Sequence, residues 1–366
     1  MTSLGVFAAF FIALLIIRLA YAKACLKNVD VKLSISAATA TEGDELYLTE
    51  VITNEKWLPL PWLAVKFQVD RELEFADTSA AAVSDMYYRN DLFHILMYQK
   101  ITRRLKFTCS RRGYYAIRGL EITGWDVLME RKYIKHFECN TRLTVYPGSL
   151  DIAETDEICT RVHGHLRAKY PIYQDPFSFG GIRDYSPSDP LRSVNFKASA
   201  RSADLMVNIR EHENARRVVL LLDIERHIAW YNEALEERAV KIIASLAERL
   251  TSRGVPLAFI TNGISIVTGS PTRMEEGRGA FHMHAILEAL AHVDISAANV
   301  LPFDGVIDEM TRERNIEPEY WLISAYFDKN VSVALRCLTE SGARAVWLMP
   351  SPKPSEEDTD AEILYV

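Results

Sequence analysis

The first 17 residues of the chain contain no charged side chain, and residues 4–17 are almost continuously apolar. Ten of them are Leu, Ile, Phe or Val, which together favour insertion into a bilayer by about 3–6 kcal/mol. Residues 3–22 would form about 30 Å of helix, enough to span a membrane, with Arg18 able to extend its guanidinium toward the interface. The pattern predicts a transmembrane anchor with a basic flank over residues 1–27.

A cleaved signal peptide is the rival interpretation, because Ala20-Tyr21-Ala22 has the small-x-small pattern of a cleavage site. Signal peptides carry positive charge before the apolar run, whereas Arg18, Lys23 and Lys27 all follow it here. The positive-inside rule then places the short N-terminus outside and the rest of the chain in the cytoplasm. We therefore expect a single-pass protein of the cell membrane.

Short strands dominate the next part of the chain. Val29, Val31, Leu33 and Ile35 alternate with polar residues, as the residues of a half-buried strand do. Further apolar runs up to residue 146 are separated by Gly, Pro, Asn and Asp. Many short strands with such punctuation predict a β-sandwich-like domain over residues 28–149.

After a mostly polar connector at residues 150–216, apolar strands alternate with amphipathic helices. The predicted strands are 218–222, 257–260, 320–323 and 345–348, and the predicted helices are 233–252, 281–291 and 331–339. This alternation is typical of a mainly parallel sheet with helices on both faces. We expect a Rossmann-like α/β domain at 217–351, an acidic tail at 352–366, and a multi-domain protein.

Composition narrows the classes of function. The net charge is −7 and the isoelectric point is near 5.8, which argues against a general nucleic-acid binder, and we expect no nucleic-acid partner. The five cysteines are scattered and odd in number, which is typical of free thiols in a reducing compartment. The chain has no P-loop motif and no Gly-x-Ser-x-Gly motif.

Residues 177–211 combine charged and aromatic side chains in a way that neither an amphipathic helix nor an alternating strand requires. We expect these charges to hold one another in a defined arrangement, as a docking network or as a binding site. The candidate binding residues are Arg183, Asp184, Tyr185, Asp189, Arg192, Asn195, Lys197 and Arg201.

Residues 181–207 resemble the signature of the bacterial domain of unknown function 58 family. Supporting matches lie at residues 54–62, 112–114, 124–126 and 145–147. Two positions depart from the family pattern, because Ser188 replaces a usual Gly and Phe196 a usual Trp. The resemblance implies a membrane-anchored protein with a β-rich region and a von Willebrand factor type A-like α/β domain.

The resemblance also implies a function. Members of this family often work beside MoxR-type AAA+ ATPases in envelope or complex maturation. We therefore expect a non-catalytic, membrane-anchored interaction or scaffold protein, with a MoxR-type ATPase as partner and an unidentified protein client. An extracellular adhesin-like protein, which requires the opposite topology, is a further alternative.

Residues 223–227 decide whether a metal is expected. Type A domains that bind Mg²⁺ carry Asp-x-Ser-x-Ser at the end of the first strand, and the hydroxyls and the carboxylate supply hard oxygen ligands. Here Asp223 is retained, while Glu225 and His227 replace both serines. We expect a degenerate site and no cofactor. The alternative is a metal-dependent enzyme that uses Asp223, Glu225 and His227 with the signature charges, and a transition ion suits that ligand set better.

Overall fold

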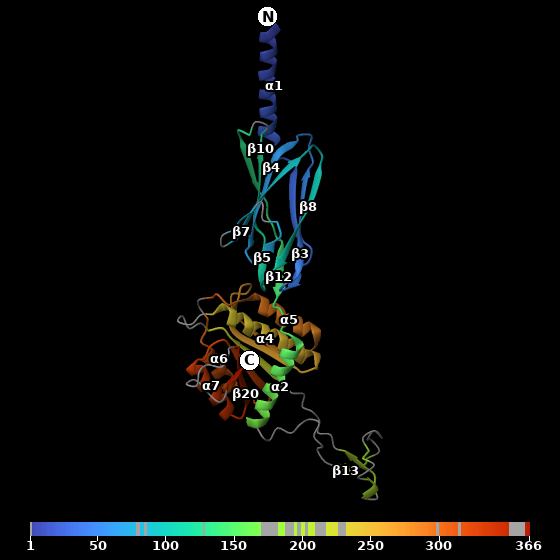
Figure 1. The fold of residues 1–366 in the computed structure, drawn as a ribbon, viewed down its shortest axis with the longest axis vertical. Helices are drawn as coiled ribbons and strands as arrows, with labels where there is room; N and C mark the ends of the chain where they lie inside the picture. The colour runs from blue at the N-terminus through green and yellow to red at the C-terminus, as the bar shows by residue number, and fades with distance from the viewer. Residues whose placement is uncertain are drawn as a thin grey trace. The chain divides into compact units, whose positions relative to one another are not determined.

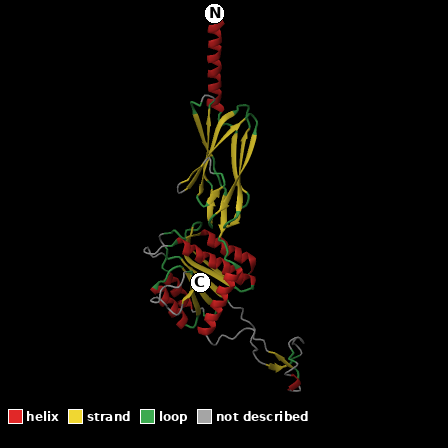
Figure 2. Cartoon of the chain, viewed as in Figure 1, coloured by secondary structure: helices red, strands yellow, loops and turns green. Residues whose placement is uncertain are grey.

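The computed structural model describes residues 2–77, 81–83, 86–126, 129–169, 182–186, 194–195, 199–201, 204–208, 217–225, 232–297, 300–313, 316–350 and 363–366. The chain divides into two compact units (Figure 1). The first contains residues 1–148 and 287–293, and the second contains residues 149–286 and 294–366. Strands make up most of the first unit, whereas helices surround a central sheet in the second (Figure 2).

The first unit contains three sheets. A four-stranded sheet has the order β1-β3-β8-β5, a five-stranded sheet the order β11-β10-β4-β7-β6, and a three-stranded sheet the order β2-β12-β9. All pairs are antiparallel except the parallel pair β2 and β12. The strands are β1 (Val29–Ile35), β2 (Thr39–Thr41), β3 (Glu45–Asn54), β4 (Leu60–Asp70), β5 (Leu73–Phe75), β6 (Ala81–Val83), β7 (Met86–Ile95), β8 (Lys100–Cys109), β9 (Gly113–Ala116), β10 (Arg118–Trp125), β11 (Lys132–His136) and β12 (Arg142–Tyr146).

The alternation read from the sequence sets which face of each strand is buried. In β1, Val29, Val31 and Leu33 are buried and the residues between them are exposed. The inward residues of the facing sheets form one apolar core, to which Ile52 of β3 and Phe67 of β4 contribute. This architecture agrees with the β-sandwich predicted for residues 28–149.

The N-terminal segment forms helix α1 (Thr2–Ala24), but no helix in the described part of the chain has the length and apolar character needed to cross a membrane. The last turns of α1 contact protein instead: Tyr21 is buried and donates a hydrogen bond to the carbonyl oxygen of Pro59 at 2.8 Å, and Arg18 pairs with Glu130. The predicted transmembrane anchor at residues 1–27 is therefore wrong, and so is the predicted single-pass location in the cell membrane.

Two of the sequence motifs meet at the end of α1. The buried ammonium group of Lys56 donates to the carbonyl oxygen of Cys25 at 2.8 Å, where a helix leaves its last carbonyl groups unpaired. A Cβ atom on Gly124 would lie 2.9 Å from a methyl carbon of Leu26 and 3.0 Å from the sulfur of Cys25, so a larger residue here would have to displace these side chains. The motifs at 54–62 and 124–126 thus hold the end of α1 on the sheets.

The second unit is built on a seven-stranded sheet with the order β17-β16-β15-β19-β20-β21, in which β18 also pairs with β16. All its pairs are parallel along this path except the antiparallel edge pair β16 and β17. Counted along the chain with β18 left out, the order is 3-2-1-4-5-6, that of a doubly wound sheet. The strands are β15 (Val218–Asp223), β16 (Leu257–Ser265), β17 (Pro271–Gly277), β18 (Val293–Asp294), β19 (Glu319–Ser324), β20 (Arg344–Met349) and β21 (Ile363–Tyr365).

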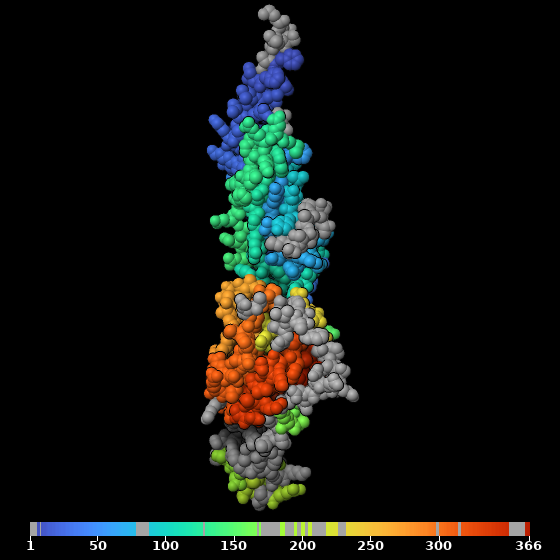
Figure 3. Space-filling model, turned by 90° about the vertical axis from the view of Figure 1, so that its left-hand side faces the viewer, coloured from blue at the N-terminus to red at the C-terminus, as the bar shows by residue number. Residues whose placement is uncertain are grey.

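Helices cover both faces of this sheet, as the sequence predicts. The described helices are α2 (Ile152–Lys169), α4 (Glu233–Ser252), α5 (Gly279–His292), α6 (Phe303–Glu313) and α7 (Lys329–Glu340). One face packs against α6 and α7, whose residues lie side by side on the orange-to-red surface in Figure 3. The other face contacts α4, which packs against α2.

Two predictions for this region need correction. Residues 150–175 look mostly polar and irregular in sequence, but residues 152–169 form α2, in which buried Ile158, Val162 and Leu166 recur at helical spacing. The acidic tail predicted at residues 352–366 ends in β21, whose Ile363 is buried beside Trp347 of β20, and residues 351–362 lie outside the described residues. Both elements gain their stability from packing that the local sequence does not reveal.

Replacing Lys56 tests how α1 is held. In Lys56→Met the apolar stem remains but the donor to the Cys25 carbonyl is lost, so we expect a loss of about 1–3 kcal/mol in the free energy of unfolding. Faster amide hydrogen exchange at residues 21–26 would locate the effect. Lys32→Met is the matched control, because the Lys32 side chain is 77% exposed. Equal exchange in both variants would contradict this role of Lys56.

Candidate functional site

The candidate site lies at the carboxyl ends of β15 and β19. These neighbouring strands form the point at which the strand order of the doubly wound sheet reverses, with Asp223 opposite Ser324 in the register. In such sheets, ligands bind outside the carboxyl ends of the strands at this position. Asp223 is the last residue of β15 and directly follows the buried strand that the sequence predicts at residues 218–222.

Asp223 is 5% exposed and accepts hydrogen bonds from three groups of its own unit. The backbone N–H of Glu225 donates to its Oδ1 at 2.8 Å, and the Asn262 amide nitrogen donates to the same oxygen at 3.0 Å. The Ser324 hydroxyl lies 3.1 Å from Oδ2. A buried carboxylate requires such donors, because the loss of water would otherwise strongly disfavour its charge.

The Asn262 side chain, on β16 just beyond the residues that pair with β15, has its orientation fixed by its contacts. Its Oδ1 accepts from the backbone N–H of Ile224 at 3.0 Å, while its Nδ2 donates to Asp223 and to the carbonyl oxygen of Leu301 at 3.1 Å. Exchanging the amide oxygen and nitrogen would set oxygen against oxygen at two of these contacts. The amide nitrogen, which is not a metal ligand, therefore faces Asp223.

Glu225 caps a helix. Its Oε2 accepts a hydrogen bond of 3.1 Å from the backbone N–H of Phe303, the first residue of α6. The first N–H groups of a helix lack partners within the helix, and the positive end of the helix dipole favours a carboxylate there. Glu225 thereby ties the segment after β15 to the start of α6.

Burial raises the pKa of Asp223 to about 6, against the lowering effect of its hydrogen bonds, and the nearby charge of Glu225 raises it further. The single hydroxyl proton of Ser324 can go to Asp223 or to the carbonyl oxygen of Tyr326, 2.8 Å away. Because the folded-state pKa lies above the ordinary value of 3.8, the contribution of Asp223 to stability is greatest below about pH 4. It is lost as the pH rises through about 6.

The donors around these carboxylates do not fit a divalent ion as the side chains stand. The oxygens of Asp223 face N–H and O–H donors, and the nearest amide presents nitrogen. Among the described residues, no group of three or more His, Cys, Asp and Glu side chains could hold a metal. His227 lies outside the described residues, so the predicted three-residue set of Asp223, Glu225 and His227 stays a prediction.

The described part of the signature forms a small two-stranded sheet of β13 (Ile182–Asp184) and β14 (Met206–Asn208). Arg183 and Asp184 lie in β13, and the backbone N–H of Tyr185 donates to the carbonyl oxygen of Leu205 at 2.8 Å. Asp184 is exposed.

Asn195 is partly buried, and its backbone N–H donates to the carbonyl oxygen of Met206 at 2.8 Å. Arg201 is exposed. Asp189, Arg192 and Lys197 lie outside the described residues. The role of the eight signature residues in binding therefore stays a prediction.

Sequence reasoning missed Asn262 and Ser324, although a signal for them exists. Each is a polar residue at or near the carboxyl end of an apolar strand that lies beside β15 in the parallel sheet. Carboxyl ends of parallel strands meet at one edge, so the polar residues ending the predicted strands 257–260 and 320–323 are expected near Asp223.

Residues 181–345 match the model of the family described as Protein of unknown function DUF58. The resemblance read from the signature is confirmed at this level. The DUF58 region contains β13, β14 and the sheet from β15 to the start of β20, and therefore Asp223, Asn262 and Ser324.

The uncharacterized protein YeaD of Bacillus subtilis (strain 168) is 22% identical to this chain over 228 residues. That alignment covers 60% of this chain and 52% of YeaD, so the chain spans about half the length of this curated relative.

Solved structures similar to part of the chain include the CARDB domain of the PF1109 protein from Pyrococcus furiosus. It has 12% identity and a TM-score of 0.22, and the match covers 32% of this chain and 90% of that one. A non-cellulosomal cohesin from Archaeoglobus fulgidus has 13% identity and a TM-score of 0.21, with coverage of 35% and 97%. Similarity at these scores carries no argument about function.

Replacing Asn262 tests the network in the DUF58 region. In Asn262→Leu, Asp223 loses one donor and the N–H of Ile224 loses its acceptor while both stay buried, so we expect a loss of about 2–4 kcal/mol in the free energy of unfolding. The matched control Asn330→Leu changes an exposed residue of α7 and should shift stability by less than about 0.5 kcal/mol. Urea unfolding measures both. Equal effects would show that Asn262 does not hold the site together.

Proposed function

We propose that this chain is a non-catalytic interaction protein, whose α/β unit presents the carboxyl edge of its sheet and the signature to a protein client. The proposal rests on one observation: both candidate carboxylates, Asp223 and Glu225, already accept hydrogen bonds from groups within the α/β unit. Asp223 receives donors from three segments and Glu225 caps α6. Carboxylates occupied in this way support the shape of a surface better than they support proton transfer or metal binding.

The surface around the Asp223 network is suited to binding protein. Leu301, whose carbonyl oxygen accepts from Asn262, is 58% exposed, and Phe327, three residues after Ser324, is 43% exposed. Ile266 and Val267, just after β16, are also exposed. Large apolar side chains exposed around a rigid polar centre are typical of protein-binding surfaces.

The partner follows from the family resemblance. We propose that the α/β unit is von Willebrand factor type A-like, which the doubly wound order of its sheet supports. We also propose a MoxR-type AAA+ ATPase as the partner that supplies energy while this chain recruits the client in envelope or complex maturation. The match to the DUF58 family, whose function is unknown, supports neither partner nor client by itself.

Affinity capture of the full chain from its source cells, with ATP present, tests the partner. We expect recovery of a MoxR-type ATPase, and weaker recovery with Arg201→Glu, which reverses an exposed charge of the signature. Arg278→Glu is the matched control, because it reverses an exposed charge outside the signature. Full recovery of other partners with no ATPase under ATP would contradict the proposal.

A metal measurement tests the enzyme alternative. The donor set around Asp223 leads us to expect less than about 0.1 transition-metal or Mg²⁺ ion per chain after purification, and no change in Tm on chelation. One ion per chain, lost in Asp223→Asn and accompanied by a lower Tm on chelation, would favour the metal-dependent enzyme instead.

A further inference from the structure

The core of the first unit contains charged side chains between its two larger sheets. Arg89 and Asp91 project from β7 of the five-stranded sheet, and Glu50 and Arg103 come from β3 and β8 of the four-stranded sheet. The residues Arg89, Asp91 and Glu50 are each at most 1% exposed. Charged groups at such depth are rare unless they are paired, so their arrangement requires a specific explanation.

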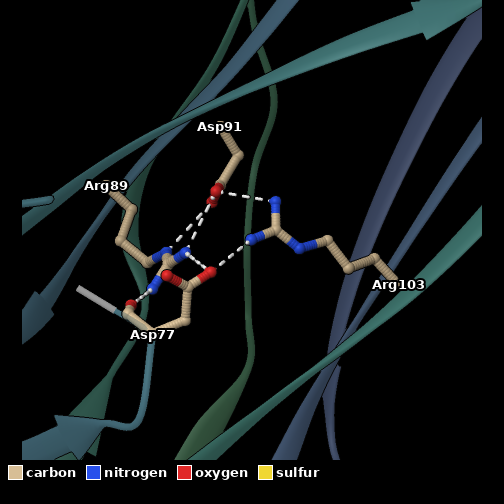
Figure 4. Close-up of polar contacts among 4 residues, drawn as sticks. All are labelled: Asp77, Arg89, Asp91 and Arg103. Atoms are coloured by element: carbon tan, nitrogen blue, oxygen red, sulfur yellow. Dashed lines mark hydrogen bonds and ion pairs between the residues drawn. The ribbon is translucent and has the colours of Figure 1, made fainter. Parts of the chain in front are cut away.

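Three of these residues, Arg89, Asp91 and Arg103, form a hydrogen-bonded network with Asp77, which follows β5 (Figure 4). Arg89 donates to both oxygens of Asp91 at 3.0 Å, and Arg103 donates to one of them at 2.8 Å. The other end of the Arg103 guanidinium donates to the carboxylate of Asp77 at 3.1 Å, and Arg89 donates to the Asp77 carbonyl oxygen at 2.7 Å. Two guanidinium groups and two carboxylates therefore form a balanced network.

Glu50 is the fifth charged residue, and it lacks a place in that network. Neither of its carboxyl oxygens has a hydrogen-bond partner among the described residues. Arg103 lies directly opposite Glu50 on β8, and Leu33 lies opposite it on β1. Burial raises the pKa of Glu50 to about 7, and the charge of Asp91 raises it further, against the opposing effect of Arg103 and Arg89.

The balance of charge explains what ionisation of Glu50 would do. A neutral Glu50 leaves the network with equal positive and negative charge, whereas an ionised Glu50 adds a buried negative charge with no donor. Arg103 is the group able to respond, because its side chain is 29% exposed and faces Glu50 across the strand pair. The side chain of Arg89 is fully buried and holds Asp91 with two hydrogen bonds.

We propose that Glu50 and Arg103 form a proton-controlled switch between the two sheets of the first unit. When Glu50 is protonated, Arg103 bridges Asp91 and Asp77. When Glu50 releases its proton to solvent, its carboxylate draws the Arg103 guanidinium toward β3, and Asp77 loses that contact. Ala76 and Asp77, which follow β5, are thereby held at lower pH and loosened near neutral pH and above.

The direction of the effect on stability follows from linkage. The folded-state pKa of about 7 lies above the ordinary value of 4.5, so the folded chain keeps a proton that the unfolded chain releases. Stability from this group is full below about pH 4.5 and is lost as the pH rises through about 7. The loss amounts to at most about 300-fold in the folding equilibrium constant.

Glu50→Gln in the full chain tests the switch, since glutamine cannot ionise. Near pH 5 the equilibrium constants for unfolding of the variant and the wild type should agree within about fivefold, and at about pH 8 the variant should be more stable by up to about 300-fold. Glu45→Gln is the matched control, because Glu45 lies on the same strand and its side chain is 58% exposed. Parallel pH profiles for the wild type and Glu50→Gln would overturn the proposal.

Two further measurements separate a switch from a merely buried acid. Amide hydrogen exchange at Ala76, whose N–H donates to the Lys106 carbonyl oxygen, should quicken above pH 7 in the wild type, beyond its intrinsic pH dependence, but not in Glu50→Gln. Carbon-13 NMR of the glutamate carboxyls in the wild type should show one titration midpoint near 7, even if the variant does not fold. Unchanged exchange at Ala76, or no glutamate with a midpoint above about 5.5, would refute the switch.

Discussion

A carboxylate removed from water must receive hydrogen bonds from the protein, and this requirement at Asp223 organises the edge of the second unit. Its donors come from the segment after β15, from β16 and from β19, so one side chain fixes three strand ends. Asn262 connects this network to the carbonyl oxygen of Leu301. Glu225, in turn, connects the segment after β15 to the start of α6. A surface fixed by such shared hydrogen bonds has one geometry, which is what recognition of a partner needs.

In the first unit, the requirement that a buried carboxylate receive hydrogen bonds is met only in part. Asp91 accepts hydrogen bonds from Arg89 and Arg103, but Glu50 is buried beside it with no donor in the described part of the chain. A structural protein would gain stability from an apolar residue at this position. In the proposed switch, Glu50 makes the interior of the sandwich sensitive to protons, and the partly exposed Arg103 side chain supplies a group that can move.

Much of the architecture could be predicted from the sequence, because the spacing of apolar residues within a segment indicates whether it forms a strand or a helix and which of its residues are buried. The alternation in β1 and the apolar run of β15 correctly predicted a sandwich and a parallel sheet. The prediction for α1 was wrong because hydropathy does not report that Tyr21 packs on the strands or that Arg18 meets Glu130. Helix α2 was missed because its polar residues outnumber the few that it buries.

The candidate site also contains some residues that the sequence could predict and others that it could not. Asp223 was predictable because it ends an apolar strand, whereas Asn262 and Ser324 become visible only when strand neighbours are known. The role of Glu225 depends on where α6 begins, which the sequence pattern did not identify. The sequence predicted a degenerate metal site at Asp223, Glu225 and His227, and it could not show which N–H groups point at Asp223 and Glu225. Donors aimed at both carboxylates make them parts of the scaffold, so specificity must come from the side chains that this scaffold displays.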